Sequence, residues 1–145
     1  MDAEDPEAIA DLAEALAPSA ERHLETMAQG AAFARTTTAA WGITVPAVAY
    51  PVAVGLAARQ LGLPADATVT LYLQAFAANI VSAGVRLIPL GQTDGQRITA
   101  SLLPLTARIA ASALSAPLEA IGGIAVGADL AAMLHETQYT RLYRS

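Results

Sequence analysis

The sequence contains no cysteine and no lysine, and it has only two histidines among its 145 residues. Without cysteine, neither a disulfide framework nor a thiolate metal site can form. Without lysine, a Schiff-base enzyme and a phosphate-binding loop ending in Gly-Lys-Ser/Thr are excluded. His23 and His135 lie far apart in the sequence, whereas a zinc or nickel site needs three or four ligands. We therefore expect this chain to bind no metal and no cofactor by itself.

Basic residues are few, and the charge that is present is mainly acidic. The formal net charge is −5, and the acids are concentrated in the first 16 residues, which contain no base. Nucleic-acid binding requires a basic surface that displaces counterions from phosphates, so we exclude it. The N-terminus has no basic segment ahead of an apolar one, so it is not a secretory signal. Together with the missing cysteines, this favours a cytoplasmic protein.

The apolar content is high, with 54% hydrophobic residues and a mean hydropathy of +0.44. The longest uncharged stretch, residues 67–85, is long enough to span a bilayer, so a small membrane-associated helical protein is the alternative to a soluble one. However, the stretch carries Gln74, Asn79 and Ser82, and much of its apolarity comes from alanine. We interpret it as a buried helix at the centre of a soluble core, without a membrane span.

Strand patterns are scarce, whereas alanine-rich segments with apolar residues at three- and four-residue spacing recur. They predict an all-α protein, a single-domain bundle of about six helices over residues 1–145. Asp5 and Ser19 are N-cap residues of the first two helices, which should end near Pro18 and Gly42. The remaining helices are expected over about residues 50–62, 64–87, 93–117 and from 129 onward.

Two details of these helices can be tested. Thr93 and Gln96 match a capping box, which would start the fifth helix at Thr93. The aromatic residues Phe33, Trp41 and Phe76 are most simply explained as core residues.

The last eleven residues, 135–145, are rich in large side chains. The His135-Glu136 pair resembles the start of a zinc-protease helix, but Tyr139 stands where the second histidine ligand would be required. Tyrosine and arginine are enriched in binding hot spots, whereas idle termini usually carry small polar residues. We therefore predict a partner-binding tail, with an unused terminus as the alternative.

The segment 89–97 is polar, contains two glycines and leads into a helix. Free amides at such a helix start can hold an anion, although a tight interhelical turn explains the composition at least as well. Asp94 has no second carboxylate near it in the sequence, so paired acid–base catalysis has no support. We expect the protein not to be an enzyme.

Two segments, Leu87 to Arg97 and the C-terminal His-Glu-Thr-Gln-Tyr-Thr-Arg-Leu-Tyr-Arg-Ser, resemble the UreF family of urease accessory proteins. The resemblance implies an all-α, dimer-forming scaffold that joins UreD (UreH) and the GTPase UreG during nickel delivery to the urease apoprotein. The nickel would be handled by the complex and not ligated by this chain alone. An N-terminal helical segment usual in the family is missing here, so a shortened form with uncovered apolar surface is expected.

The resemblance also implies site residues. The tail is expected to contact UreD through His135, Gln138, Tyr139, Arg141 and Tyr143. The segment before the fifth helix is expected at the dimer interface or the GTPase-facing surface, with Gln92, Thr93, Asp94, Gln96 and Arg97 as its residues.

Overall fold

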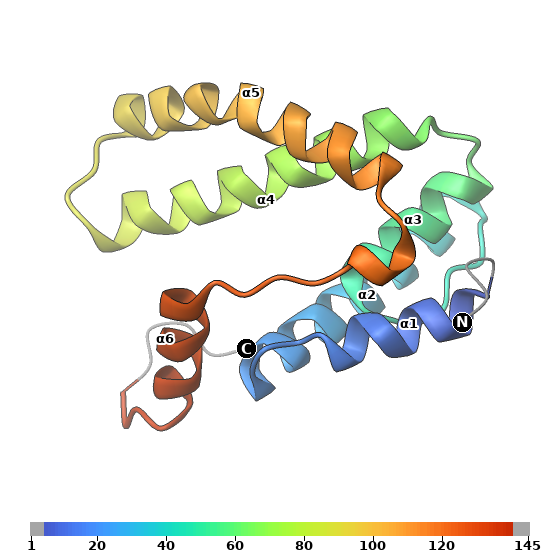
Figure 1. Cartoon of the computed structure of the whole chain (residues 1–145), viewed down its shortest axis with the longest axis horizontal. Helices are drawn as coiled ribbons and strands as arrows, with labels where there is room; N and C mark the ends of the chain where they lie inside the picture. The colour runs from blue at the N-terminus through green and yellow to red at the C-terminus, as the bar shows by residue number, and fades with distance from the viewer. Residues whose placement is uncertain (1–4, 141–145) are drawn as a thin grey trace. The chain divides into compact units, whose positions relative to one another are not determined.

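The computed structural model describes residues 5–140 (Figure 1). Within them all regular elements are helices, which confirms the predicted all-α class of about six helices. The α helices are α1 (Pro6–Ala15), α2 (Ala20–Trp41), α3 (Tyr50–Gln60), α4 (Ala65–Leu87), α5 (Gln92–Ser115) and α6 (Val126–Glu136), and a 3-10 helix, η1, covers Leu118–Ala120.

The chain forms two compact units. One consists of Met1–Leu61 with Leu118–Ser145, and the other of Gly62–Pro117. The first unit therefore contains α1, α2, α3 and α6, and the second contains α4 and α5. The division describes packing alone, so the single domain expected over residues 1–145 stays a prediction.

The first two helices begin as predicted. The Asp5 carboxylate accepts a hydrogen bond from the Glu7 amide at 3.0 Å, and the Ser19 hydroxyl accepts one from the Arg22 amide at 3.2 Å. Each contact satisfies an amide that has no partner inside the helix. α2 ends at Gly42, whose φ of 67° is accessible to glycine at little energetic cost.

The core of the first unit lies where α2 packs against α3. Ala34, Val45, Ala53 and Ala57 form its buried cluster. These side chains are small, so the helix backbones can approach closely. At Gly30 the approach is closest, because a Cβ built there would lie 1.8 Å from the Val48 carbonyl oxygen. The alanine content therefore supports close helix packing in this unit.

Side chains fix the connection between α2 and α3. The Gln60 amide group bonds both backbone groups of Thr44, accepting from the N–H at 3.2 Å and donating to the carbonyl at 2.7 Å. The Thr26 hydroxyl accepts a hydrogen bond from the Tyr50 amide at the start of α3. Phe33 packs edge-on against the Tyr50 ring, with centroids 5.6 Å apart. Phe33 is thus a partly buried neighbour of the core cluster, in line with its prediction as a core aromatic.

The second unit is a helical hairpin in which α4 packs along α5 (Figure 1). Gly95 of α5 is buried against α4, where a Cβ would lie 2.8 Å from a Val85 methyl group. The prediction that α4 is a surrounded core helix is wrong, since no residue of α4 is buried. One packed neighbour covers one side of a helix and leaves the rest of its circumference open. Phe76 is accordingly 46% exposed, and in the first unit Trp41 is 61% exposed, so neither is a core aromatic.

Both hairpin helices are long and apolar enough to cross a membrane by length and composition. In the most apolar 18-residue segment of each helix, 0% of the residues of α4 and 11% of those of α5 are buried. The core helix of a soluble protein passes the same test of composition, but it is mostly buried. The exposure of these two helices therefore requires an explanation.

The capping box predicted at Thr93 is also wrong. α5 begins at Gln92 with Gly91 as its N-cap, and no side chain caps it. Thr93 lies one residue inside the helix, where its hydroxyl cannot occupy the cap position. Packing of Gly95 on Val85 and Val81 of α4 holds this first turn in place.

Candidate functional site

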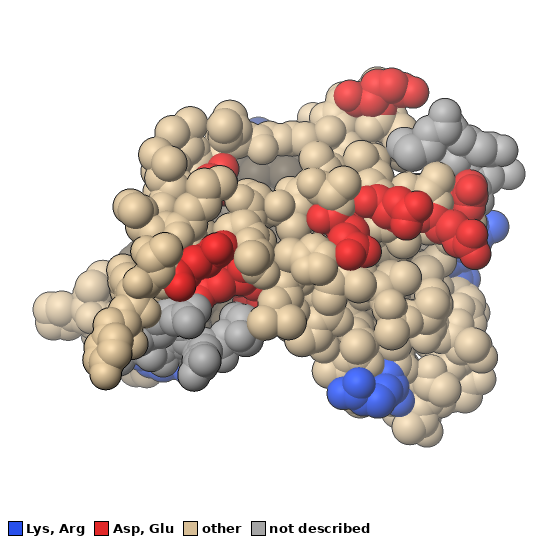
Figure 2. Space-filling model, turned by 90° about the horizontal axis from the view of Figure 1, so that it is seen from below, with Lys and Arg blue, Asp and Glu red and all other residues tan. Residues whose placement is uncertain are grey.

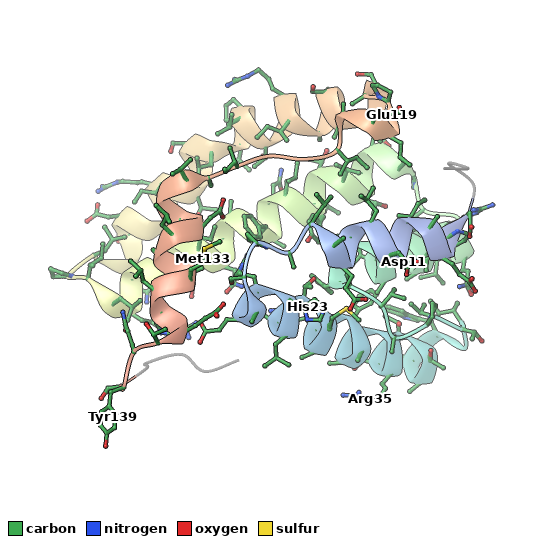
Figure 3. The ribbon with its side chains drawn as sticks, turned by 60° about the horizontal axis from the view of Figure 1, so that its bottom comes forward. Asp11, His23, Arg35, Glu119, Met133 and Tyr139 are labelled. Atoms are coloured by element: carbon green, nitrogen blue, oxygen red, sulfur yellow. The ribbon has the colours of Figure 1, made fainter. Side chains whose placement is uncertain are left out.

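The predicted partner-binding tail begins at the end of α6. Thr137 is the C-cap of this helix, and its hydroxyl donates a hydrogen bond to the Leu134 carbonyl. Gln138 and Tyr139 follow in the exposed part of the chain, and Figure 3 shows Tyr139 beyond the helix end. Arg141 and Tyr143 lie outside the described residues. The structure therefore places His135, Gln138 and Tyr139 at one end of α6.

His135 and Glu136 point to α2 of the same unit. His135 Nδ1 lies 2.6 Å from Glu21 Oε2, and the two side chains are 29% and 19% exposed. Glu136 Oε1 accepts hydrogen bonds from the amides of Ala20 and Glu21, at 2.8 and 3.4 Å. A carboxylate at a helix N-terminus satisfies free amides and is favoured by the helix dipole. The pair that resembled a zinc-protease motif is thus engaged in a contact between helices.

The other side of α6 is apolar and exposed. Val126, Leu130, Met133 and Leu134 are 48–66% exposed. Their spacing of four, three and one residues puts them on one face of a helix. Figure 3 shows Met133 on this helix, which ends at Glu136. We call this face the α6 stripe; sequence reasoning missed it, although its spacing is visible in the sequence.

The predicted loop residues belong to the second unit and are helical. Gln92, Thr93, Asp94, Gln96 and Arg97 all lie in the first two turns of α5, and all are exposed. Asp94 and Arg97 form an ion pair at 2.9 Å, with 54% and 75% of their side chains exposed. An exposed pair one helical turn apart adds little stability. These side chains are therefore available for a partner.

α1 has two different sides. Its acidic residues Glu7, Asp11 and Glu14 are exposed, and Figure 2 shows acidic side chains gathered over this helix. On the side facing α3 there is an open apolar groove of about 530 Å³, lined by residues such as Leu12 and Leu56. No predicted site residue lines this groove. Among residues 5–140, no group of three or more His, Asp or Glu is arranged to hold a metal ion.

The fold and these surfaces define an all-α protein whose candidate site is a helical surface for contact with another protein. The family model for UreF matches residues 1–103. The chain belongs to the UreF family.

Curated relatives support the same assignment. The urease accessory protein UreF of Cereibacter sphaeroides (strain KD131 / KCTC 12085) is 57% identical over 141 residues, which cover 97% of this chain and 67% of the relative. The protein of the same name from Dinoroseobacter shibae is 53% identical, covering 96% of this chain and 66% of the relative. That of Rhodopseudomonas palustris (strain HaA2) is 49% identical, covering 94% and 62%. The chain thus spans about two thirds of the length of the relatives that it matches.

Proposed function

We propose that the chain is a non-enzymatic scaffold of urease maturation that links UreD (UreH) and the GTPase UreG for nickel insertion into the urease apoprotein. Family membership supports the urease context, because the relatives are named urease accessory proteins. In this proposal nickel is cargo of the assembled complex, and this chain contributes binding surfaces in the cytoplasm.

The α6 stripe with the adjoining tail is the observation that carries the proposal. Exposed apolar residues on one helical face are the usual means by which a helix binds a groove of another protein. Tyr139 is fully exposed three residues beyond the end of α6, and tyrosine is a frequent hot-spot residue. We assign UreD to this surface, with Gln138, Tyr139, Arg141 and Tyr143 as contacts and His135 at the base of the tail.

The exposed start of α5 is a second binding surface in this proposal. Gln92, Thr93, Asp94, Gln96 and Arg97 present polar and charged groups of both signs, which suit a polar interface. We assign this surface to UreG or to a homodimer contact. If the surface binds UreG, Arg97→Ala should weaken capture of UreG. If it is a homodimer contact, the Arg97→Ala variant should sediment with a smaller mass than the wild type.

The test of the proposed function is co-purification with UreD. Tyr139→Ala should weaken UreD binding by about thirtyfold or more, because truncation of a hot-spot residue costs about 2 kcal/mol or more. Trp41→Ala is the matched control, since it removes an exposed aromatic side chain at the far end of α2, and it should bind like the wild type. The tail would be ruled out as the UreD site if Tyr139→Ala bound UreD as tightly as the wild type does. It would also be ruled out if Tyr139→Ala and Trp41→Ala lost the same amount of UreD affinity.

Membrane association through the α4–α5 hairpin is the competing function, and the low burial of these helices favours it. Asn79 on α4 opposes it, because its side chain is exposed and a polar side chain facing lipid is costly. Fractionation of cells decides between the two. A pool that stays with membranes after carbonate washing would support the hairpin as a membrane anchor, and recovery in the soluble fraction would support the scaffold.

A further inference from the structure

The N-terminus of α2 is completed by two different parts of the chain. In any α helix the first four amides have no acceptor within the helix. In α2, Ser19 serves one of them, because its hydroxyl accepts from the Arg22 amide at 3.2 Å. The Ser19 carbonyl accepts the first regular bond of the helix, from the His23 amide at 2.9 Å. This local cap leaves the amides of the first two helical residues without an acceptor nearby in the sequence.

Glu136 supplies that acceptor from the end of α6. Its Oε1 lies 2.8 Å from the Ala20 nitrogen and 3.4 Å from the Glu21 nitrogen, across a sequence separation of 116 and 115 residues. The shorter bond is within the normal range, and the longer one is weak. A charged acceptor makes the shorter bond stronger than a neutral one would be.

His135 makes a second contact with the same turn of α2. Its Nδ1 lies 2.6 Å from Glu21 Oε2, and both side chains are mostly buried. His23 and Glu14 also form a close pair, at 2.8 Å, but with side chains 42% and 48% exposed. The contact between His135 and Glu21 is therefore the more shielded of the two histidine–carboxylate pairs. We call the contacts of His135 and Glu136 with Ala20 and Glu21 the α2–α6 clasp.

The clasp lies directly before the tail leaves the helix. The Gln138 amide donates to the His135 carbonyl at 3.1 Å, so the chain is tied to α6 as far as this residue. The α6 stripe ends at Leu134, and by helical periodicity His135 and Glu136 project from other sides of the helix. A partner on the stripe and tail can thus be bound while the clasp stays closed.

We propose that His135 and Glu136 are positioning residues that act through α2, and that direct partner contacts of the tail begin at Gln138. The clasp holds the end of α6 on α2, which sets the direction in which the chain leaves the helix at Gln138. This inference rests on the proposed UreD-binding function. A tail held in its binding position only a tenth of the time binds about tenfold more weakly.

The clasp can be measured without any partner, by hydrogen exchange of the Ala20 and Glu21 amides. Glu136→Ala should speed exchange at Ala20 by roughly tenfold or more, since a hydrogen bond to a charged group is lost. Glu136→Gln keeps an acceptor oxygen and should retain part of the protection. Exchange at Arg22, which Ser19 caps, should change less in both variants. Unchanged exchange at Ala20 in Glu136→Ala would disprove the clasp.

A double-mutant cycle in the full chain separates positioning from direct contact. His135→Gln and Glu21→Gln should each weaken UreD binding by about five- to tenfold, and the double variant should be no weaker than the single ones. Glu21 is not in the tail, so a loss of binding in Glu21→Gln that is not deepened in the double variant would show that Glu21 and His135 act on UreD binding together. Glu14→Gln is the matched control, because it breaks the other histidine–carboxylate pair and should leave UreD binding unchanged.

The possible results have distinct meanings. Loss of binding in His135→Gln with normal binding in Glu21→Gln would show that His135 contacts UreD directly, which overturns the inference. Normal binding in both variants, with faster exchange at Ala20, would show a clasp that does not position the tail, which also overturns it. Failure of the wild-type chain to bind UreD would refute the proposed function together with the positioning role, while amide exchange would still report whether the clasp exists.

Discussion

At the scale of single residues, Gly30 determines how closely α2 approaches the segment before α3. A methyl group there would lie 1.8 Å from the Val48 carbonyl oxygen and 3.0 Å from the Tyr50 nitrogen. Backbone atoms cannot rotate away as the end of a flexible side chain can. Glycine is therefore needed at position 30 because it has no side chain. Its backbone freedom is not the reason, since Gly30 lies inside a helix and adopts an ordinary helical φ.

Gly30→Ala should lower the free energy of unfolding of the first unit by about 3 kcal/mol or more, because the added carbon forces the backbones apart. Gly55→Ala is the matched control on α3, where a Cβ would have nothing within 4 Å. There alanine should stabilise the helix by about 0.5–1 kcal/mol. Urea unfolding followed by circular dichroism measures both. Equal stability of the two variants would contradict the close packing at Gly30.

At the scale of elements, the six helices differ in how their N-termini are completed. Asp5 and Ser19 cap α1 and α2 with their side chains, whereas α3, α4, α5 and α6 have no side-chain cap from the N-cap residue. The hydroxyl of Thr93 resembles that of Ser19 chemically but lies inside its helix. This difference can be tested directly.

Ser19→Ala should lower the free energy of unfolding by about 1 kcal/mol, because the Arg22 amide loses its acceptor. Thr93→Ala should instead raise the free energy of unfolding by roughly 0.5 kcal/mol, because alanine is the better helix former at an exposed helical position. Thermal and urea unfolding of the two variants provide the comparison. A larger loss of stability in Thr93→Ala than in Ser19→Ala would show that Thr93 does cap α5.

The sequence predicted those parts of the helices that depend on neighbouring residues. Asp5, Ser19 and Gly42 act within one turn of the helix that they begin or end, so local pattern was sufficient. Glu136 acts on α2 across 116 residues, and no local pattern contains that information. For the same reason the sequence indicated a binding tail at residue 135 but gave no sign that the first two residues of this tail contact α2.

At the scale of the whole molecule, exposed apolar surface is the dominant property. α4 was expected in the core because its sequence is apolar on most sides, but composition shows only that a surface is apolar. It does not show whether the same chain or another molecule covers that surface. Leu71 and Ile80 of α4 are 63% and 58% exposed. Such a surface on a hairpin of two helices favours association.

Replacing Leu71 and Ile80 together by glutamine should reduce binding of the dye ANS and reduce concentration-dependent association in sedimentation. The stability of the protein should change by less than about 1 kcal/mol, because neither side chain is buried. Ala110→Gln is the contrasting control, since Ala110 is 2% exposed and has no room for a larger polar side chain. Unfolding caused by the double glutamine variant would show that the two opposite sides of α4 that carry Leu71 and Ile80 are packed in the isolated protein.

The α2–α6 clasp also has a consequence for the order of events during synthesis. Ala20 and Glu21 are made early, but the carboxylate that bonds their amides is 116 and 115 residues later in the chain. The start of α2 therefore stays open to water while the ribosome makes the rest of the protein, and closing so long a loop is slow compared with forming a local turn. The clasp can close only on a chain whose first unit has already folded, so under the positioning role that we propose, a partner that needs the closed clasp selects finished molecules over nascent ones.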